Sequence, residues 1–112
     1  MDLKFTVRYG ADTAIIACAG RLVYGDEAAS LRARVKELIA QGAKSVTLDL
    51  AGVTYLDSGA LGVLTGLRMS AQQANCHFRL ANLTPRTAKL LQTTNLENFF
   101  DIEESTGVRR SA

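Results

Sequence analysis

The stretch from Leu48 to Leu64, LDLAGVTYLDSGALGVL, contains the change from strand to helix on which the fold depends. The apolar run over residues 45–50 predicts a buried β-strand. After a short loop, apolar residues at helical spacing predict an α-helix from Gly59 to about Asn75. Its apolar positions are Leu61, Leu64, Leu67 and Ala71. One serine, Ser58, lies on the connecting loop between an aspartate and a glycine.

The sequence before this stretch predicts a hairpin and a helix. Residues 3–9 and 13–22 have the patterns of two strands, and the turn composition Gly10-Ala11-Asp12 separates them. A helix is predicted to start at Gly25 or Asp26 and to end at Gly42, because glycine readily adopts the left-handed conformation that ends helices.

The sequence after this stretch predicts a strand over residues 77–83 and a helix opened by Thr84-Pro85. Asn95 is expected to end that helix. A last helix or strand then closes the core with Leu96, Phe99, Phe100 and Ile102. This order of elements indicates one α/β domain over residues 1–112, with a sheet largely covered by helices.

Composition excludes several classes of function. The 112 residues carry a net charge of +2, with no basic cluster other than Arg109-Arg110, so no nucleic-acid partner is expected. Cys18 and Cys76 lack metal-ligand spacing and are interpreted as buried thiols, so no metal is expected. The sequence shows no secretory signal and no apolar stretch long enough to span a bilayer. A cytoplasmic protein without a membrane segment is the expectation.

Ser58 has four interpretations at this stage. Ser58 or Asp57 caps the helix, because either side chain can accept a hydrogen bond from a free amide. Ser58 is a hydrolase nucleophile, with His77 as the only histidine available as its base. The glycines Gly59 and Gly62 form an anion-binding turn, although P-loop spacing is absent. The fourth interpretation is that Ser58 is itself phosphorylated.

The segment VTLDLAGVTYLDSGALGVL resembles the signature of the STAS domain, specifically that of the bacterial anti-sigma factor antagonists. CAGRLVYGDEAASLRARV and FRLANLTPRTAKLLQTTNLENFFDI resemble the family's second strand with its first helix and its closing elements. The resemblance therefore covers nearly the whole chain. It implies a single STAS-like domain with a mixed β-sheet of about four or five strands covered by about four helices.

By the same resemblance, Ser58 corresponds to the serine that an anti-sigma factor with serine-kinase activity phosphorylates. The unphosphorylated form binds the anti-sigma factor and frees the sigma factor, and a PP2C-type phosphatase resets the phosphorylated form. The chain would then be a phosphorylation substrate without catalytic residues or a cofactor. The alternative is a STAS accessory subunit of a lipid or solute transport system that is not phosphorylated.

Residues around Ser58 are predicted to contact the partner. Ser58, Gly62, Thr65 or Gly66, and Met69 recur at near-helical spacing, and their small side chains suit either a close partner or tight packing within the domain. Asp57 and Gly59 flank the serine. Under the fold that the resemblance implies, Tyr24 and Tyr55 lie on loops beside Ser58, as contact aromatics or as half-buried loop tyrosines.

Three further positions qualify the resemblance. Asp49 is expected either to order backbone amides near Ser58 or to occupy an exposed edge. Gly59-Ala60 stands where the family often has a small hydroxyl residue followed by glycine. Val23 stands where many members have an acid, and the nearest acid is Asp26. The last two differences would bear on partner choice and phosphorylation efficiency.

Overall fold

The computed structural model describes residues 3–103, and these form five strands and three helices. In chain order the elements are β1 (Leu3–Tyr9), β2 (Thr13–Leu22), α1 (Asp26–Ala40), β3 (Ser45–Leu56), α2 (Ser58–Gln73), β4 (His77–Ala81), α3 (Pro85–Thr93) and β5 (Asp101–Glu103). The predicted mixed α/β sheet is confirmed. The described residues contain three helices where about four were expected.

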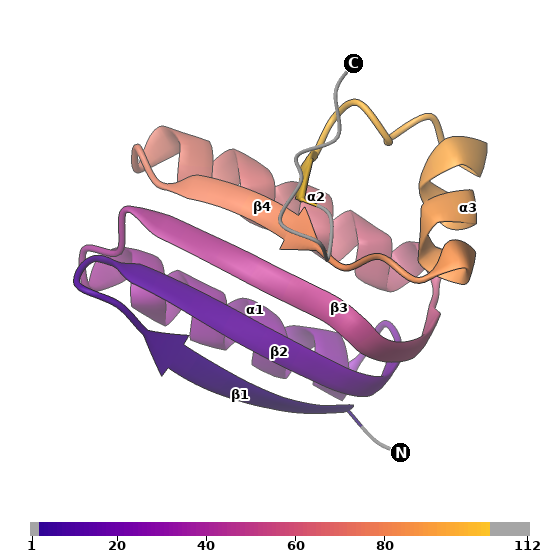
Figure 1. Ribbon diagram of the computed structural model, residues 1–112, viewed down its shortest axis with the longest axis horizontal. Coiled ribbons are helices and arrows are strands. Elements are labelled where there is room, and N and C mark those ends of the chain that lie inside the picture. The colour runs from indigo at the N-terminus through magenta and orange to yellow at the C-terminus, as the bar shows by residue number, and fades with distance from the viewer. Residues whose placement is uncertain (1–2, 104–112) are drawn as a thin grey trace.

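One mixed sheet organises the molecule, with the strand order β1-β2-β3-β4-β5. β1 and β2 form the predicted antiparallel hairpin, and every later pair is parallel. Each parallel step needs a crossover, and α1, α2 and α3 provide them. Figure 1 shows α1 and α2 together behind the sheet, while α3 stands at the end where β3 and β4 finish. The start of α2 is therefore close to the carboxyl ends of the central strands.

The core lies between the sheet and the helices α1 and α2. Along β2 the residues Ala14, Ile16 and Cys18 are buried, whereas their neighbours Thr13 and Ile15 are exposed. On α2 the predicted apolar positions Leu61, Leu64, Leu67 and Ala71 are buried as expected. On α1 the apolar residues Ala28, Leu31, Val35 and Leu38 are buried, and Ile39 is half-buried. Burial of these side chains, at about 25 cal/mol per Å², fixes the orientation of both helices.

The helix boundaries follow from their capping residues. Thr84 caps α3 through its hydroxyl, which accepts a hydrogen bond from the Thr87 amide at 3.2 Å, and Pro85 is the first residue of the helix. Gly42 and Asn95 have φ values of 98° and 61° after α1 and α3, as predicted. The chain then closes with the short strand β5, and Phe100 is buried. Arg109-Arg110 lies outside the described residues.

The end of β3 differs from the prediction, because the strand continues past residue 50 to Leu56. The sequence AGVTY looked like a loop, but it pairs with the second half of β2 through two register shifts. At the first shift Gly52 allows close packing, since an added Cβ would lie 2.9 Å from the Cys18 carbonyl oxygen. Tyr55 is consequently in a strand. Ser58 is not on a loop, because α2 begins with it.

Gly52→Ala should lower the free energy of unfolding by about 1–3 kcal/mol, because the new methyl group would push β2 away from β3. The midpoint of urea denaturation measures this loss. Gly66→Ala is the matched control, since a Cβ on Gly66 would meet no atom within 4 Å. Equal midpoints for the two variants would contradict the close approach at Gly52.

Candidate functional site

Asp57 joins two segments that are distant in sequence. As the N-cap of α2, its Oδ1 atom accepts a hydrogen bond from the Ala60 amide at 2.8 Å. The same carboxylate accepts from the Tyr24 amide, at 3.1 Å to Oδ1 and 3.2 Å to Oδ2. A cap of this kind contributes about 1 kcal/mol. The Asp57 carboxylate therefore holds the turn between β2 and α1 against the start of α2.

Ser58 is the first residue of α2, and its side chain is exposed. In the part of the chain that the structure describes, its hydroxyl makes no hydrogen bond. The cap interpretation thus applies to Asp57 and not to Ser58. The result is a serine hydroxyl presented to solvent at the N-terminus of a helix.

The hydrolase interpretation is wrong on geometric grounds. His77 pairs with Ser45 at the start of β3, whereas Ser58 follows the end of that strand. The 12 residues of β3 therefore lie between them, and the two residues are at opposite ends of the sheet. The His77 Nε2 atom instead contacts the Asp101 carboxylate. His77 is the only histidine of the 112 residues.

The two cysteines are unsuited to nucleophilic chemistry. Burial raises the pKa of the Cys18 thiol to about 12, and the Asp49 carboxylate adds to this effect. Burial also raises the pKa of Cys76. Both thiols therefore remain protonated at neutral pH. Residues 3–103 contain no group of three or more histidine, cysteine or acidic side chains that could hold a metal ion.

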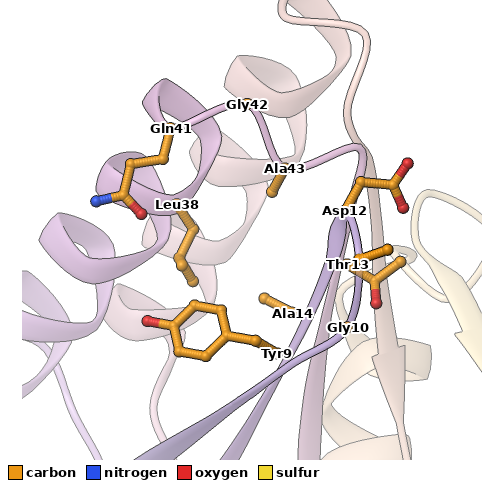
Figure 2. Close-up of a pocket in the computed structure, with 10 residues that line it drawn as sticks. Tyr9, Gly10, Asp12, Thr13, Ala14, Leu38, Gln41, Gly42 and Ala43 are labelled. Carbon is orange, nitrogen blue, oxygen red and sulfur yellow. The ribbon is translucent and has the colours of Figure 1, made fainter.

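A small pocket lies at the opposite end of the domain from Ser58, between the β1–β2 hairpin and the end of α1. Its volume is about 140 Å³, and Figure 2 shows the side chains of Tyr9 and Leu38 pointing into it. A second depression of about 410 Å³ lies on the sheet face away from α1 and α2, lined by Thr47, Arg79 and other strand residues. Ser58 lines neither of these cavities.

The predicted stripe on α2 reaches the surface. Ser58, Gly62, Gly66 and Met69 are all exposed. A Cβ on Gly62 or Gly66 would meet no atom within 4 Å, so tight packing within the domain does not explain these glycines. Thr65 is half-buried, and its hydroxyl donates back to the Gly62 carbonyl at 2.7 Å.

Gly59 is different, because its neighbour is Tyr24. A Cβ on Gly59 would lie 2.6 Å from the Tyr24 Cβ. This contact and the Asp57 hydrogen bond place the backbone of Tyr24 against the first turn of α2. Tyr24 as a whole nevertheless remains 71% exposed. The structure thus brings Tyr24 close to Asp57, Ser58 and Gly59, the proximity that the family resemblance implied.

Tyr55 has two arginine neighbours that sequence reasoning did not identify. Arg21 on β2 lies 5.0 Å from the centre of the Tyr55 ring, and Arg86 on α3 lies 5.7 Å from it. The Tyr55 side chain is 37% exposed. The three residues come from separate elements, so only the pairing of β2 with β3 and the position of α3 reveal the cluster.

Asp49 lies on the central strand β3, so it does not occupy a sheet edge. Its Oδ1 atom accepts a hydrogen bond from the Ala51 amide at 3.0 Å. The carboxylate therefore orders the backbone at the register shift between Asp49 and Gly52, within the strand that leads to Ser58.

The fold and this helix N-terminus define a STAS domain. The STAS domain family model matches residues 5–108, and the chain belongs to that family. Within it, the anti-sigma-B factor antagonist of Bacillus subtilis is 30% identical over 103 residues, covering 91% of this chain and 92% of the relative. The chain is therefore a member of the anti-sigma factor antagonists.

Other similar proteins are more distant or shorter in overlap. A STAS-domain containing protein of Pseudomonas aeruginosa is 41% identical over 66 residues, which span 59% of this chain and 65% of that protein. SpoIIAA in its unphosphorylated form has the same fold, with a TM-score of 0.77, 20% identity and coverage of 91% and 88%. The phosphorylated form of Bacillus SpoIIAA also has this fold, with a TM-score of 0.72, 20% identity and 91% coverage of both chains. No helix in residues 3–103 is long and apolar enough to cross a membrane.

Gly59 and Gly62 should respond oppositely to alanine. Gly59→Ala should destabilise the domain by about 1–3 kcal/mol, since the methyl group would displace Tyr24. Gly62→Ala should stabilise it by up to about 1 kcal/mol, because alanine is the better helix former and meets no neighbour. Thermal unfolding of the two variants measures both effects. A destabilised Gly62→Ala variant would show that the helix surface is more crowded than the structure indicates.

Proposed function

We propose that this protein is a phosphorylation-controlled antagonist of an anti-sigma factor. In its unphosphorylated form it binds an anti-sigma factor that has serine-kinase activity, and the sigma factor is released. Phosphorylation of Ser58 ends this binding, and a PP2C-type phosphatase restores it. Because the kinase requires ATP, the proposal places the protein in the cytoplasm.

The observation that carries the proposal is the Ser58 hydroxyl, which makes no hydrogen bond within residues 3–103. The side chain is exposed, and Asp57 already provides the helix cap. A kinase can therefore approach Ser58 without opening the domain. The name of the Bacillus subtilis relative and the existence of SpoIIAA in a phosphorylated form support the same assignment.

The domain itself should tolerate a phosphoryl group at Ser58. Phosphorylation adds about −1.5 to −2 charges and three acceptor oxygens. At the N-terminus of α2 this charge faces the positive end of the helix dipole and amides without intrahelical partners. The local helix is therefore not expected to melt. The effect of phosphorylation must fall on the partner.

The exposed stripe explains how the partner would detect the change. Gly62 and Gly66 leave the backbone of α2 accessible beside Ser58, and Met69 is 55% exposed farther along. A partner helix or loop that packs on this surface would bring apolar groups close to Ser58. A phosphoryl group there adds bulk and negative charge next to Asp57, and both oppose a desolvated contact. Gly59, Tyr24 and Tyr55 complete the proposed contact surface.

Incubation with the candidate anti-sigma factor kinase of the host and Mg-ATP should add phosphate at Ser58 and nowhere else, as mapped by mass spectrometry. Ser58→Ala should accept no phosphate. Ser58→Glu should bind the kinase at least about tenfold more weakly, because charge is introduced into the contact. Thr6→Glu is the control for added charge, since Thr6 is exposed on β1 at the far edge of the sheet.

Wild-type affinity for the Ser58→Glu variant would contradict the proposal. The same result, combined with failure of the kinase to modify Ser58, would favour the transport-subunit alternative, in which the α2 surface docks without phosphorylation.

A further inference from the structure

We propose that Arg21, Tyr55 and Arg86 form a docking site for a carboxylate side chain of the anti-sigma factor. The three residues come from β2, β3 and α3, and we call them the arginine–tyrosine cluster. This inference rests on the proposed function, because it names the partner's chemistry at the same end of the domain as Ser58.

Both guanidinium groups of the cluster lie against one aromatic ring. The Cζ atom of Arg21 is 5.0 Å from the centroid of the Tyr55 ring, and that of Arg86 is 5.7 Å from it. Arg21 is paired with Tyr55 in the register of β2 and β3. Arg86 reaches the ring from the first turn of α3. The electron-rich faces of the ring attract both cations.

Among residues 3–103, the cluster carries positive charge without a neutralising acid. Within residues 3–103, neither Arg21 nor Arg86 has a carboxylate within 4.0 Å, whereas Arg34 is paired with Glu37. The Asp57 carboxylate is turned toward the amides of Tyr24 and Ala60. Both arginines are exposed. Two like charges held on one ring repel each other, and an anion bound beside them would offset this repulsion.

The donors of the cluster match a carboxylate better than a neutral group. Within residues 3–103 neither guanidinium donates a hydrogen bond, so the planar fork of N–H groups on each arginine is available. These donors can form two parallel hydrogen bonds with a carboxylate. Contact with the ring also restricts the arginine before binding, so less side-chain freedom is lost. Arginine and tyrosine are moreover the residue types that contribute most to binding at protein interfaces.

The site of modification lies near the cluster. Tyr55 precedes Ser58 by three residues, so their Cα atoms are within about 11 Å. A phosphoryl group on Ser58 would therefore reduce the positive field that attracts the partner's acid. Phosphorylation would weaken docking through the arginines as well as through direct contact at the α2 surface.

The test measures the affinity of the anti-sigma factor kinase that modifies Ser58 by isothermal titration calorimetry. Arg21→Gln and Arg86→Gln should each weaken binding about five- to tenfold, and the double variant about 50-fold. The losses should shrink as ionic strength rises. Lys44→Gln is the matched control, because Lys44 is an exposed cation before the start of β3, at the other end of the sheet. Its affinity should stay within about twofold of wild type.

Binding of the double variant within about twofold of wild type would overturn the inference, as would an equal loss in Lys44→Gln. Should the double variant fail to fold, the Arg21→Lys/Arg86→Lys variant replaces it. That variant keeps the charges and loses the planar donors, so it should bind about threefold more weakly. Wild-type affinity of the lysine variant would then overturn the inference.

The Ser58→Glu variant separates this inference from the proposed function. If Ser58→Glu abolishes binding while the double arginine variant binds normally, the carboxylate docking site is wrong and the phosphorylation switch stands. If Ser58→Glu binds normally, the switch is wrong, and the docking site that rests on it is overturned as well.

Discussion

The Asp57 carboxylate is the interaction on which the rest of the site depends. It accepts hydrogen bonds from the Ala60 amide of α2 and from the Tyr24 amide of the turn before α1. One side chain therefore caps a helix and ties it to a segment 33 residues earlier. Because Asp57 accepts the hydrogen bonds of these amides, the neighbouring Ser58 hydroxyl is not needed to cap the helix. Of these two adjacent polar residues, Asp57 therefore stabilises the fold, and Ser58 is exposed to solvent.

The long strand β3 determines where Asp57 and Ser58 lie. A strand that ended near residue 50 would have left Ser58 on a loop of several residues, with many conformations available. In the structure β3 continues to Leu56, and its second half is held to β2 by pairing and by the close approach at Gly52. Only Asp57 then separates strand from helix. The pairing of β3 within the sheet therefore also fixes the position of Ser58.

Sequence periodicity was sufficient for most of the fold. The apolar runs of β2 and β3 and the leucine spacing in α2 identified much of the core, because buried strands and the buried face of a helix require those patterns. The extension of β3 was missed because AGVTY contains a register shift, and the odd residue breaks the alternation that marks a strand. A β-bulge depends on the partner strand, which a linear sequence does not show.

The sequence suggested which residues belong to the candidate site, but it did not show how they are arranged. The structure places Tyr24 against the first turn of α2, which carries Ser58 and leads to Gly62, while the role of these residues in partner binding stays a prediction. The sequence did not show whether Asp57 or Ser58 caps the helix, since either side chain can do so. In the structure the cap is Asp57. The contact between Arg21 and the Tyr55 ring has no local sequence signal, because the two residues are on different strands.

Urea denaturation of Asp57→Ala and Ser58→Ala, compared under identical conditions, tests the division of roles most directly. Asp57→Ala should lower the free energy of unfolding by about 1–3 kcal/mol, because it removes the cap and the tie to Tyr24. Ser58→Ala should change it by less than about 0.5 kcal/mol, as expected of an exposed side chain without partners. A loss in Ser58→Ala as large as that in Asp57→Ala would show that the serine supports the fold and is not free to serve as a switch.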